Sequence, residues 1–321
     1  MTRLKLGTRG SQLALFQATT TAALLKTHAG VDCEIVVIKT SGDRLAEAVL
    51  SEVGGKRLFV KEIEDSLLAG EIDLAVHSSK DLPAVLPAGL TIGAVLPRED
   101  PRDAVVLPGG RTTSTLQEVG AALGEAPRIG TSSVRRIAQL TRLFPAARFQ
   151  PVRGNLDTRL RKLDSGDYDA LVLAAAGLRR LNHQHRISAV LPAETCVPAP
   201  GQGIIAIEIR DDDVRARDHV ATIDDALTGV ALVAERTVVT RLGGGCQMPI
   251  GVYARIDGET VYLSAIVSAL DGKRDVRASD EGSVHEPEAV GVRVAEALLA
   301  RGAATILTEA QRVSSDTIEQ P

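Results

Sequence analysis

The stretch Leu6-Gly-Thr-Arg-Gly-Ser-Gln-Leu-Ala-Leu15 decides what type of fold the chain begins with. It joins the apolar run Leu4–Leu6, through a glycine-bearing turn, to a predicted helix that Ser11 could cap and whose apolar residues recur at helical spacing as far as Leu25. A second apolar run, Cys33–Ile38, follows. Strand, helix and strand in this order are typical of a mostly parallel sheet covered by helices, so the first segment predicts an α/β domain.

The same pattern starts again at Arg128. Ile129 enters a turn at Gly130–Ser132, a helix is predicted as far as Leu140, and Ala170–Ala174 has the composition of a buried strand. We therefore expect a second α/β domain after the first.

Two proline-rich segments separate these domains. Pro97–Asp103 combines prolines with charges, which is typical of a segment where the chain passes from one domain to the next. Val197–Gly203 is the candidate for the return crossing, and Ile204–Ile209 after it is predicted to be a strand that rejoins the first sheet. Two crossings would make the first domain discontinuous.

The rest of the chain predicts a smaller domain, with strands at Val252–Arg255 and Val261–Val267 and a helix at Val290–Leu299. The predicted limits are residues 1–98 with 202–220 for the first domain, 99–201 for the second and 221–321 for the third. The predicted fold class is α/β, with two lobes facing a shared cleft and a third, α+β domain.

Composition excludes several classes of function. The 321 residues exceed what one core usually serves, and no apolar run reaches the length of a membrane span. The N-terminus lacks the apolar segment of a secretory signal, so we expect a cytoplasmic protein without a membrane partner. A net charge of −4 and very few aromatic residues argue against a nucleic-acid partner. Arginines outnumber lysines 29 to 8, which fits either a codon bias or selection for binding anions.

Arginines and hydroxyls gather at three predicted strand-to-helix junctions. The start of a helix favours anions through its free backbone N–H groups and its dipole, although a purely structural N-cap explains each junction taken alone. In an open α/β sheet ligands lie at the carboxyl ends of strands, so all three junctions should face one cleft and bind a polyanion. The residues in question are Arg9 and Ser11 at the first junction, Thr131, Ser132, Arg135 and Arg136 at the second, and Arg153 and Arg159 at the third.

Two further segments carry chemistry. Ala75–Pro83 ends a buried strand with Lys80 and Asp81, and the lysine favours an ionised carboxylate that can hold positive charge on a substrate, although a plain turn fits the same residues. Cys246 follows three glycines, which keeps its thiol on an exposed loop and available for covalent chemistry. The other cysteines, Cys33 and Cys196, lie in apolar or proline-rich surroundings and are expected to be inert. No metal site is predicted.

With these residues in view, the chain resembles the hydroxymethylbilane synthases (porphobilinogen deaminases) over nearly its whole length. Seven blocks in order carry the resemblance, and they are Gly7-Thr-Arg-Gly-Ser11, Val53-Gly-Gly-Lys-Arg-Leu-Phe-Val-Lys61, His77-Ser-Ser-Lys-Asp81, Gly130-Thr-Ser-Ser-Val-Arg-Arg136, Arg153-Gly-Asn155, Pro200-Gly-Gln-Gly203 and Gly245-Cys-Gln247. The fold that the resemblance implies has two lobes like those of a type II periplasmic binding protein and a third domain with the cofactor loop.

The resemblance also implies a reaction. A dipyrromethane cofactor would be attached by a thioether to Cys246, and four porphobilinogen molecules would be deaminated and added to it in turn. Hydrolysis would then release hydroxymethylbilane, which passes to uroporphyrinogen-III synthase. We expect the enzyme to be a monomer.

The resemblance assigns roles residue by residue. Asp81 matches the catalytic carboxylate, which would stabilise the azafulvene cation formed when ammonia leaves. The cofactor would contact Cys246, Lys80, Asp81, Thr131, Ser132, Arg135, Arg136, Arg153 and Gly154, and the substrate would contact Arg9, Ser11, Phe59, Arg153, Arg159 and Arg180.

Two other interpretations compete with this one. A two-lobed fold often only binds ligands, so a non-catalytic binding module for a polycarboxylate is the main alternative. Such a module would have no use for a cysteine on a triple-glycine loop. An enzyme that has lost its activity is the second alternative, and the presence of Asp81 and Cys246 argues against it.

Overall fold

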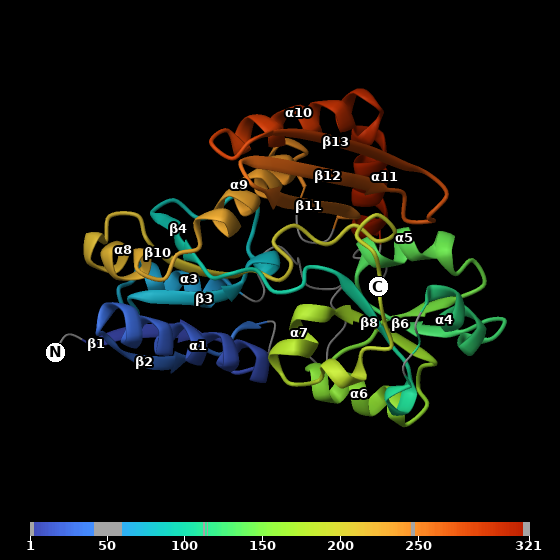
Figure 1. Ribbon diagram of the computed structural model, residues 1–321, viewed down its shortest axis with the longest axis horizontal. Coiled ribbons are helices and arrows are strands. Elements are labelled where there is room, and N and C mark those ends of the chain that lie inside the picture. Colours follow the sequence, from blue (N-terminus) through green and yellow to red (C-terminus); the bar gives the residue numbers. More distant parts are fainter. Residues whose placement is uncertain (1–2, 42–59, 112, 114, 245–247, 317–321) are drawn as a thin grey trace.

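The computed structural model describes residues 3–41, 60–111, 113, 115–244 and 248–316, with side chains as far as residue 313. It contains three sheets, each with its own helices, and Figure 1 shows them as three bodies. The α/β fold class with a separate smaller sheet, predicted from sequence, is confirmed. The limits of the three domains stay a prediction.

The first sheet has five strands in the order β2-β1-β3-β10-β4, at the left of Figure 1. Its first helix begins where the sequence predicts, because the Ser11 side chain accepts a hydrogen bond from the backbone N–H of Ala14. The elements are β1 (Arg3–Thr8), α1 (Gln12–Ala29), β2 (Asp32–Val37), α3 (Lys61–Leu68), β3 (Leu74–Ser78), β4 (Leu90–Val95), β10 (Ile205–Arg210) and α8 (Val214–Ala221), with the 3₁₀ turn η2 (Ser79–Asp81) directly after β3.

The second sheet repeats this arrangement with the order β7-β6-β8-β5-β9. Three neighbouring strands are parallel in each sheet, namely β2-β1-β3 in the first and β7-β6-β8 in the second, and the next strand, β10 or β5, is antiparallel to them. The elements are β5 (Asp103–Val106), η3 (Pro108–Gly110), α4 (Leu116–Leu123), β6 (Arg128–Gly130), α5 (Val134–Leu143), β7 (Arg148–Gln150), α6 (Leu156–Asp164), β8 (Ala170–Ala174), α7 (Ala175–Arg180), η4 (Gln184–Arg186) and β9 (Ala189–Val190).

The antiparallel strand of each sheet follows a crossing of the chain. β5 begins at Asp103, directly after the first crossing, and β10 follows the second crossing and lies between β3 and β4. The predicted return of a strand to the first sheet is therefore confirmed. Both crossings run beside the ends of β3 and β8, so they border the space between the two lobes.

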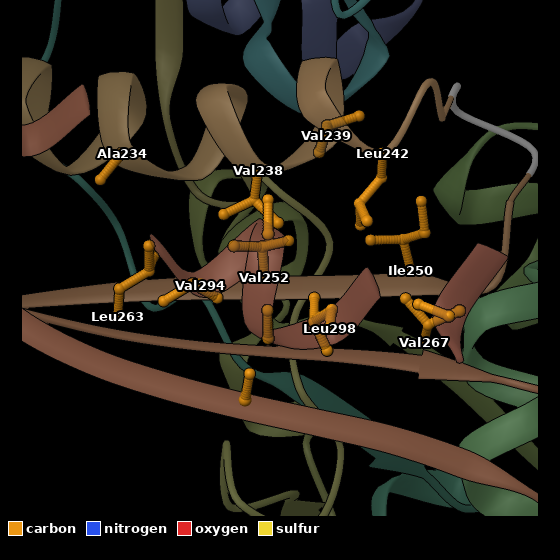
Figure 2. Close-up of a cluster of buried hydrophobic side chains, with 14 of the residues drawn as sticks. Ala234, Val238, Val239, Leu242, Ile250, Val252, Leu263, Val267, Val294 and Leu298 are labelled. Atoms are coloured by element: carbon orange, nitrogen blue, oxygen red, sulfur yellow. The ribbon is translucent and has the colours of Figure 1, made fainter. Parts of the chain in front are cut away.

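The third sheet is antiparallel, in the order β11-β12-β13. Helices α9 and α10 cover it, and Figure 2 shows Val238 of α9 and Leu298 of α10 directed at Val252 and its neighbours on the strands. This packing removes a continuous apolar surface from water, which is the main stabilising force on this part. The elements are α9 (Ala226–Arg241), β11 (Ile250–Asp257), β12 (Thr260–Ser268), β13 (Asp275–Ser283), α10 (Pro287–Ala300) and α11 (Ala303–Asp316).

A buried ion pair joins the three parts. The carboxylate of Glu235, on α9, accepts hydrogen bonds from Arg98 Nη1 at 2.6 Å, from the backbone N–H of Gly201 at 2.6 Å and from that of Ala254 at 2.7 Å. Arg98 lies on the first crossing, Gly201 on the second and Ala254 on β11. One carboxylate therefore fixes where both crossings meet the third sheet.

Within the described ranges, no helix is both long and apolar enough to cross a membrane.

Candidate active site

Lys80 and Asp81 lie in η2, immediately after the buried strand β3. Asp81 is exposed, and Lys80 is half-buried with its Nζ 3.5 Å from Oε1 of Gln202. Burial and the nearby charge of Arg136 lower the pKa of Lys80 to about 8, although Asp81 and Asp103 act in the opposite direction. The ammonium is therefore mostly charged at neutral pH and can attract an acid group, and it loses its proton as the pH rises past about 8.

A cavity of about 80 Å³ opens beside Lys80, and all three parts of the molecule contribute to its lining. Its cations are Lys80, Arg135 and Arg236, so it suits a ligand that carries acid groups. Met248 also lines it and is the first described residue after the gap that contains Cys246. The full lining is Ser79, Lys80, Leu82, Ala84, Ser133, Arg135, Ala199, Pro200, Leu232, Arg236, Val239, Met248 and Ile250.

The hydroxyls at the second junction have different surroundings. Thr131 is buried, and Ser132 Oγ donates to the carbonyl of Val152 at 3.0 Å while it accepts from the N–H of the same residue at 3.1 Å. Ser133 caps α5 by accepting from the N–H of Arg136, and it lines the cavity. Sequence analysis did not single out Ser133, although its position one residue before a helix is the signal of an N-cap.

Arg135 and Arg136 are buried, and both are bound to Asp103. Arg135 Nη1 lies 2.7 Å from Asp103 Oδ2, and Arg136 contacts Oδ1 through Nη2 at 2.7 Å and Nε at 3.0 Å. Burial opposes ionisation of Asp103, but the two guanidinium groups hold its pKa well below the usual range. Sequence analysis named both arginines and missed the carboxylate between them.

At least one donor of Arg135 remains unused. Its Nε is buried, lies in a residue that lines the cavity, and has no hydrogen-bond partner within the described part of the chain. A buried donor without a partner is costly, and a carboxylate from a ligand would satisfy it. The residues around the cavity therefore fit a bound group with acid side chains.

The third junction positions Arg159. The carbonyl of Gly154 accepts a hydrogen bond from Arg159 Nε at 2.8 Å. Burial and the charge of Arg136 lower the pKa of Arg159, and Asp81 opposes them, so all three groups lie close enough to interact. Gly154 has φ +102°, and a Cβ there would lie 2.7 Å from the side chain of Thr158. Arg153, at the same junction, is half-buried.

A second, smaller cavity of about 60 Å³ brings Arg9 and Ser11 together with Asp81. Arg9 and Ser11 come from the turn before α1, and Asp81 comes from η2, directly after β3. Asp81, which is far from Arg9 and Ser11 in the sequence and was named separately from them, therefore lines the same cavity.

Arg180 and Arg179 end α7 beside the crossings. Arg180 Nη2 donates to the carbonyl of Gly203 at 2.6 Å, and burial lowers the pKa of Arg180 to about 10, against the effect of Glu99. Arg179 pairs with Asp100 at 3.3 Å. Both side chains thus contact the crossings, and a contact of Arg180 with substrate stays a prediction. Cys246 and Phe59 lie outside the described residues.

Comparison with known proteins decides the family. A family model described as porphobilinogen deaminase, dipyromethane cofactor binding domain, matches residues 4–218, and one described as porphobilinogen deaminase, C-terminal domain, matches residues 230–300. The chain belongs to the porphobilinogen deaminase family. The porphobilinogen deaminase of Syntrophobacter fumaroxidans is 46% identical over 310 residues, 96% of this chain and 98% of that one. That of Acidithiobacillus ferrooxidans is 47% identical over 307 residues, 95% of this chain and 97% of that one.

Among solved structures, immunogenic lipoprotein A of Vibrio vulnificus matches with a TM-score of 0.43 at 14% identity, covering 70% of this chain and 96% of that chain. Membership of the porphobilinogen deaminase family confirms the predicted function class, a transferase of the hydroxymethylbilane synthase type that uses a dipyrromethane cofactor. The non-catalytic binding module is not favoured.

Proposed function

We propose that the chain adds four porphobilinogen molecules, one at a time, to a dipyrromethane that stays attached to Cys246, and then releases hydroxymethylbilane by hydrolysis. The observation that carries the proposal is the side chain of Arg135, which lines a cationic cavity beside Lys80 and whose buried Nε has no partner within the described residues. Porphobilinogen carries one acetate and one propionate per ring, so a growing chain of rings needs many such donors.

The bound dipyrromethane supplies the pyrrole carbon to which the first substrate is joined. The residues of this chain that would hold its acid groups are Lys80, Thr131, Ser132, Arg135, Arg136, Arg153 and Gly154. Arg135 supports this assignment best, because its unused Nε is rigidly held. Ser133 joins the proposed set, since it lines the same cavity.

Asp81 would act on the substrate. Its exposed carboxylate lies in the short turn η2 after the buried strand β3 and lines a cavity together with Arg9 and Ser11. A carboxylate there stabilises positive charge as it develops on the pyrrole nitrogen of porphobilinogen when ammonia leaves. Arg9 and Ser11 would hold the substrate's acid groups, and the other proposed substrate contacts are Phe59, Arg153, Arg159 and Arg180.

Asp81→Asn tests the catalytic role. Because Asp81 is exposed, the variant should keep the melting temperature of the wild type. Turnover should fall by at least about 100-fold, which is the loss expected when one preorganised charge-stabilising group is removed. Turnover within a few-fold of wild type would show that another group stabilises the charge.

We also propose that the enzyme works as a monomer in the cytoplasm and passes its product to uroporphyrinogen-III synthase. Light scattering during size-exclusion chromatography checks the first point. A mass twice that of the chain would show a dimer.

The decisive test of the function is intact mass spectrometry of the purified protein and of its Cys246→Ser variant. A thioether survives denaturation, so the wild type should exceed its sequence mass by two deaminated porphobilinogen units, and the variant should not. A wild type that stays at its sequence mass after incubation with porphobilinogen would favour a binding module instead.

A further inference from the structure

A single buried carboxylate connects several of the proposed acid-binding cations. Asp103 is the first residue of β5, directly after the first crossing, and it is fully buried. It receives hydrogen bonds from Arg135 Nη1, from Arg136 Nη2 and from Arg136 Nε, at 2.7, 2.7 and 3.0 Å. It lines neither of the two cavities described above, so it would not touch a ligand.

Gln202, on the second crossing, extends the network to Lys80. Its Nε2 donates to Asp103 Oδ1 at 2.9 Å and to the carbonyl of Pro101 at 2.6 Å. Both partners are acceptors only, so they fix the orientation of the amide and direct its Oε1 toward the Lys80 ammonium, 3.5 Å away. The position of Asp103 is thereby transmitted to a third cation.

We infer that Asp103 is a positioning residue for acid binding, because it orients Arg135, Arg136 and, through Gln202, Lys80, so that their remaining donors meet the acid groups of cofactor and substrate. The inference rests on the proposed function. Its geometric basis is which nitrogens Asp103 accepts from. It accepts from Nε and Nη2 of Arg136 but only from Nη1 of Arg135, so Nε of Arg135, a residue that lines the cavity, keeps no partner within the described residues.

Charge supports the same conclusion. One carboxylate between two guanidinium groups offsets part of their repulsion and leaves one net positive charge for a ligand. Asp103 and Asp81 also favour the charged form of Lys80, whereas burial, Arg136 and Arg135 oppose it. Removal of the Asp103 charge should therefore lower the pKa of Lys80 below its present value of about 8.

The experiment compares the wild type with Asp103→Asn. Apo-protein, made in cells that lack porphobilinogen, is mixed with porphobilinogen, and the gain of two deaminated units is followed by intact mass. We expect loading to slow by about 10- to 100-fold, the usual effect of removing a partner that orients a ligating group. The pH above which loading declines should also fall. Unchanged loading and pH dependence would overturn the inference, whereas a wild type that never gains mass would overturn the proposed function.

Asp103→Asn removes the negative charge that partly neutralises the buried Arg135 and Arg136, which destabilises the fold. A second comparison therefore separates slower loading from failure to fold. Arg136→Gln is compared with Arg136→Gln/Asp103→Asn, in which one positive and one negative charge are removed together. We expect the double variant to load more slowly than the single one, because Arg135 and Lys80 still need Asp103. Equal or faster loading would mean that Asp103 serves only to neutralise Arg136, and would overturn the inference.

Asp169→Asn is the matched control. Asp169 lies in the same lobe and also binds an arginine, Arg128, but at the surface. Its loading rate and pH dependence should equal those of the wild type. A loss as large as that of Asp103→Asn would trace the effect to the stability of the lobe and would overturn the inference.

Discussion

Glu235→Gln should destabilise the junction of the three parts strongly. The carboxylate accepts hydrogen bonds from Arg98, Gly201 and Ala254, which come from the two crossings and from β11. A glutamine places an NH₂ group where a second acceptor is needed, so one backbone N–H meets a donor. It also removes the charge that pairs with the largely buried Arg98. Breaking one side of a buried ion pair costs about 3–5 kcal/mol.

Thermal unfolding measures this loss. At about 2 °C per kcal/mol for a chain of this size, the melting temperature of the first transition should fall by about 6–10 °C. The three parts need not unfold together, so limited proteolysis at the crossings is measured in parallel. The control is Glu309→Gln, which breaks an exposed pair with Arg274 and should hardly change the melting temperature. A decrease for Glu235→Gln no larger than that of the control would refute the reasoning.

Three further predictions concern other residues. Above pH about 8 the Lys80 side chain loses its charge, so the KM of the wild type should rise. Lys80→Arg keeps its charge and should remove this rise in KM. A rise that persists in the variant would contradict the prediction. Gly203→Ala places a Cβ 2.2 Å from the Glu99 carbonyl and should lower the melting temperature more than Gly258→Ala, which has φ +58° and open space; equal decreases would disprove the clash. Cys196, whose pKa burial raises to about 12, should resist thiol reagents at pH 8 until the protein unfolds, as peptide mapping would show.

The sequence predicts most of what local patterns govern. The helix cap at Ser11 and the predicted strand Ile204–Ile209, observed as Ile205–Arg210, agree with the structure. Strand Asp275–Ser283 escaped prediction because it lies at the edge of its sheet and is mostly polar, so no alternation marks it.

Buried polar partners were beyond the reach of the sequence. Asp103 looks like one more charge in a solvated hinge, yet it binds arginines more than thirty residues away. Glu235 lies within helix α9, and no residue pattern around it indicates that the two crossings contact its carboxylate. Such partners are chosen by the tertiary fold, because a buried charge has to find an opposite charge wherever the chain brings one.

The adjacent arginines at 135 and 136 show what this means for function. In sequence they are equivalent, but neighbouring residues of a helix point about 100° apart, so the fold treats them differently. Arg136 uses Nε and Nη2 on Asp103 and Nη1 on the carbonyl of Val172, whereas Arg135 keeps a buried Nε without a partner in the described residues. The capacity to bind acid groups is thus decided by the donors that the protein leaves unused, and Asp103 determines which donors those are.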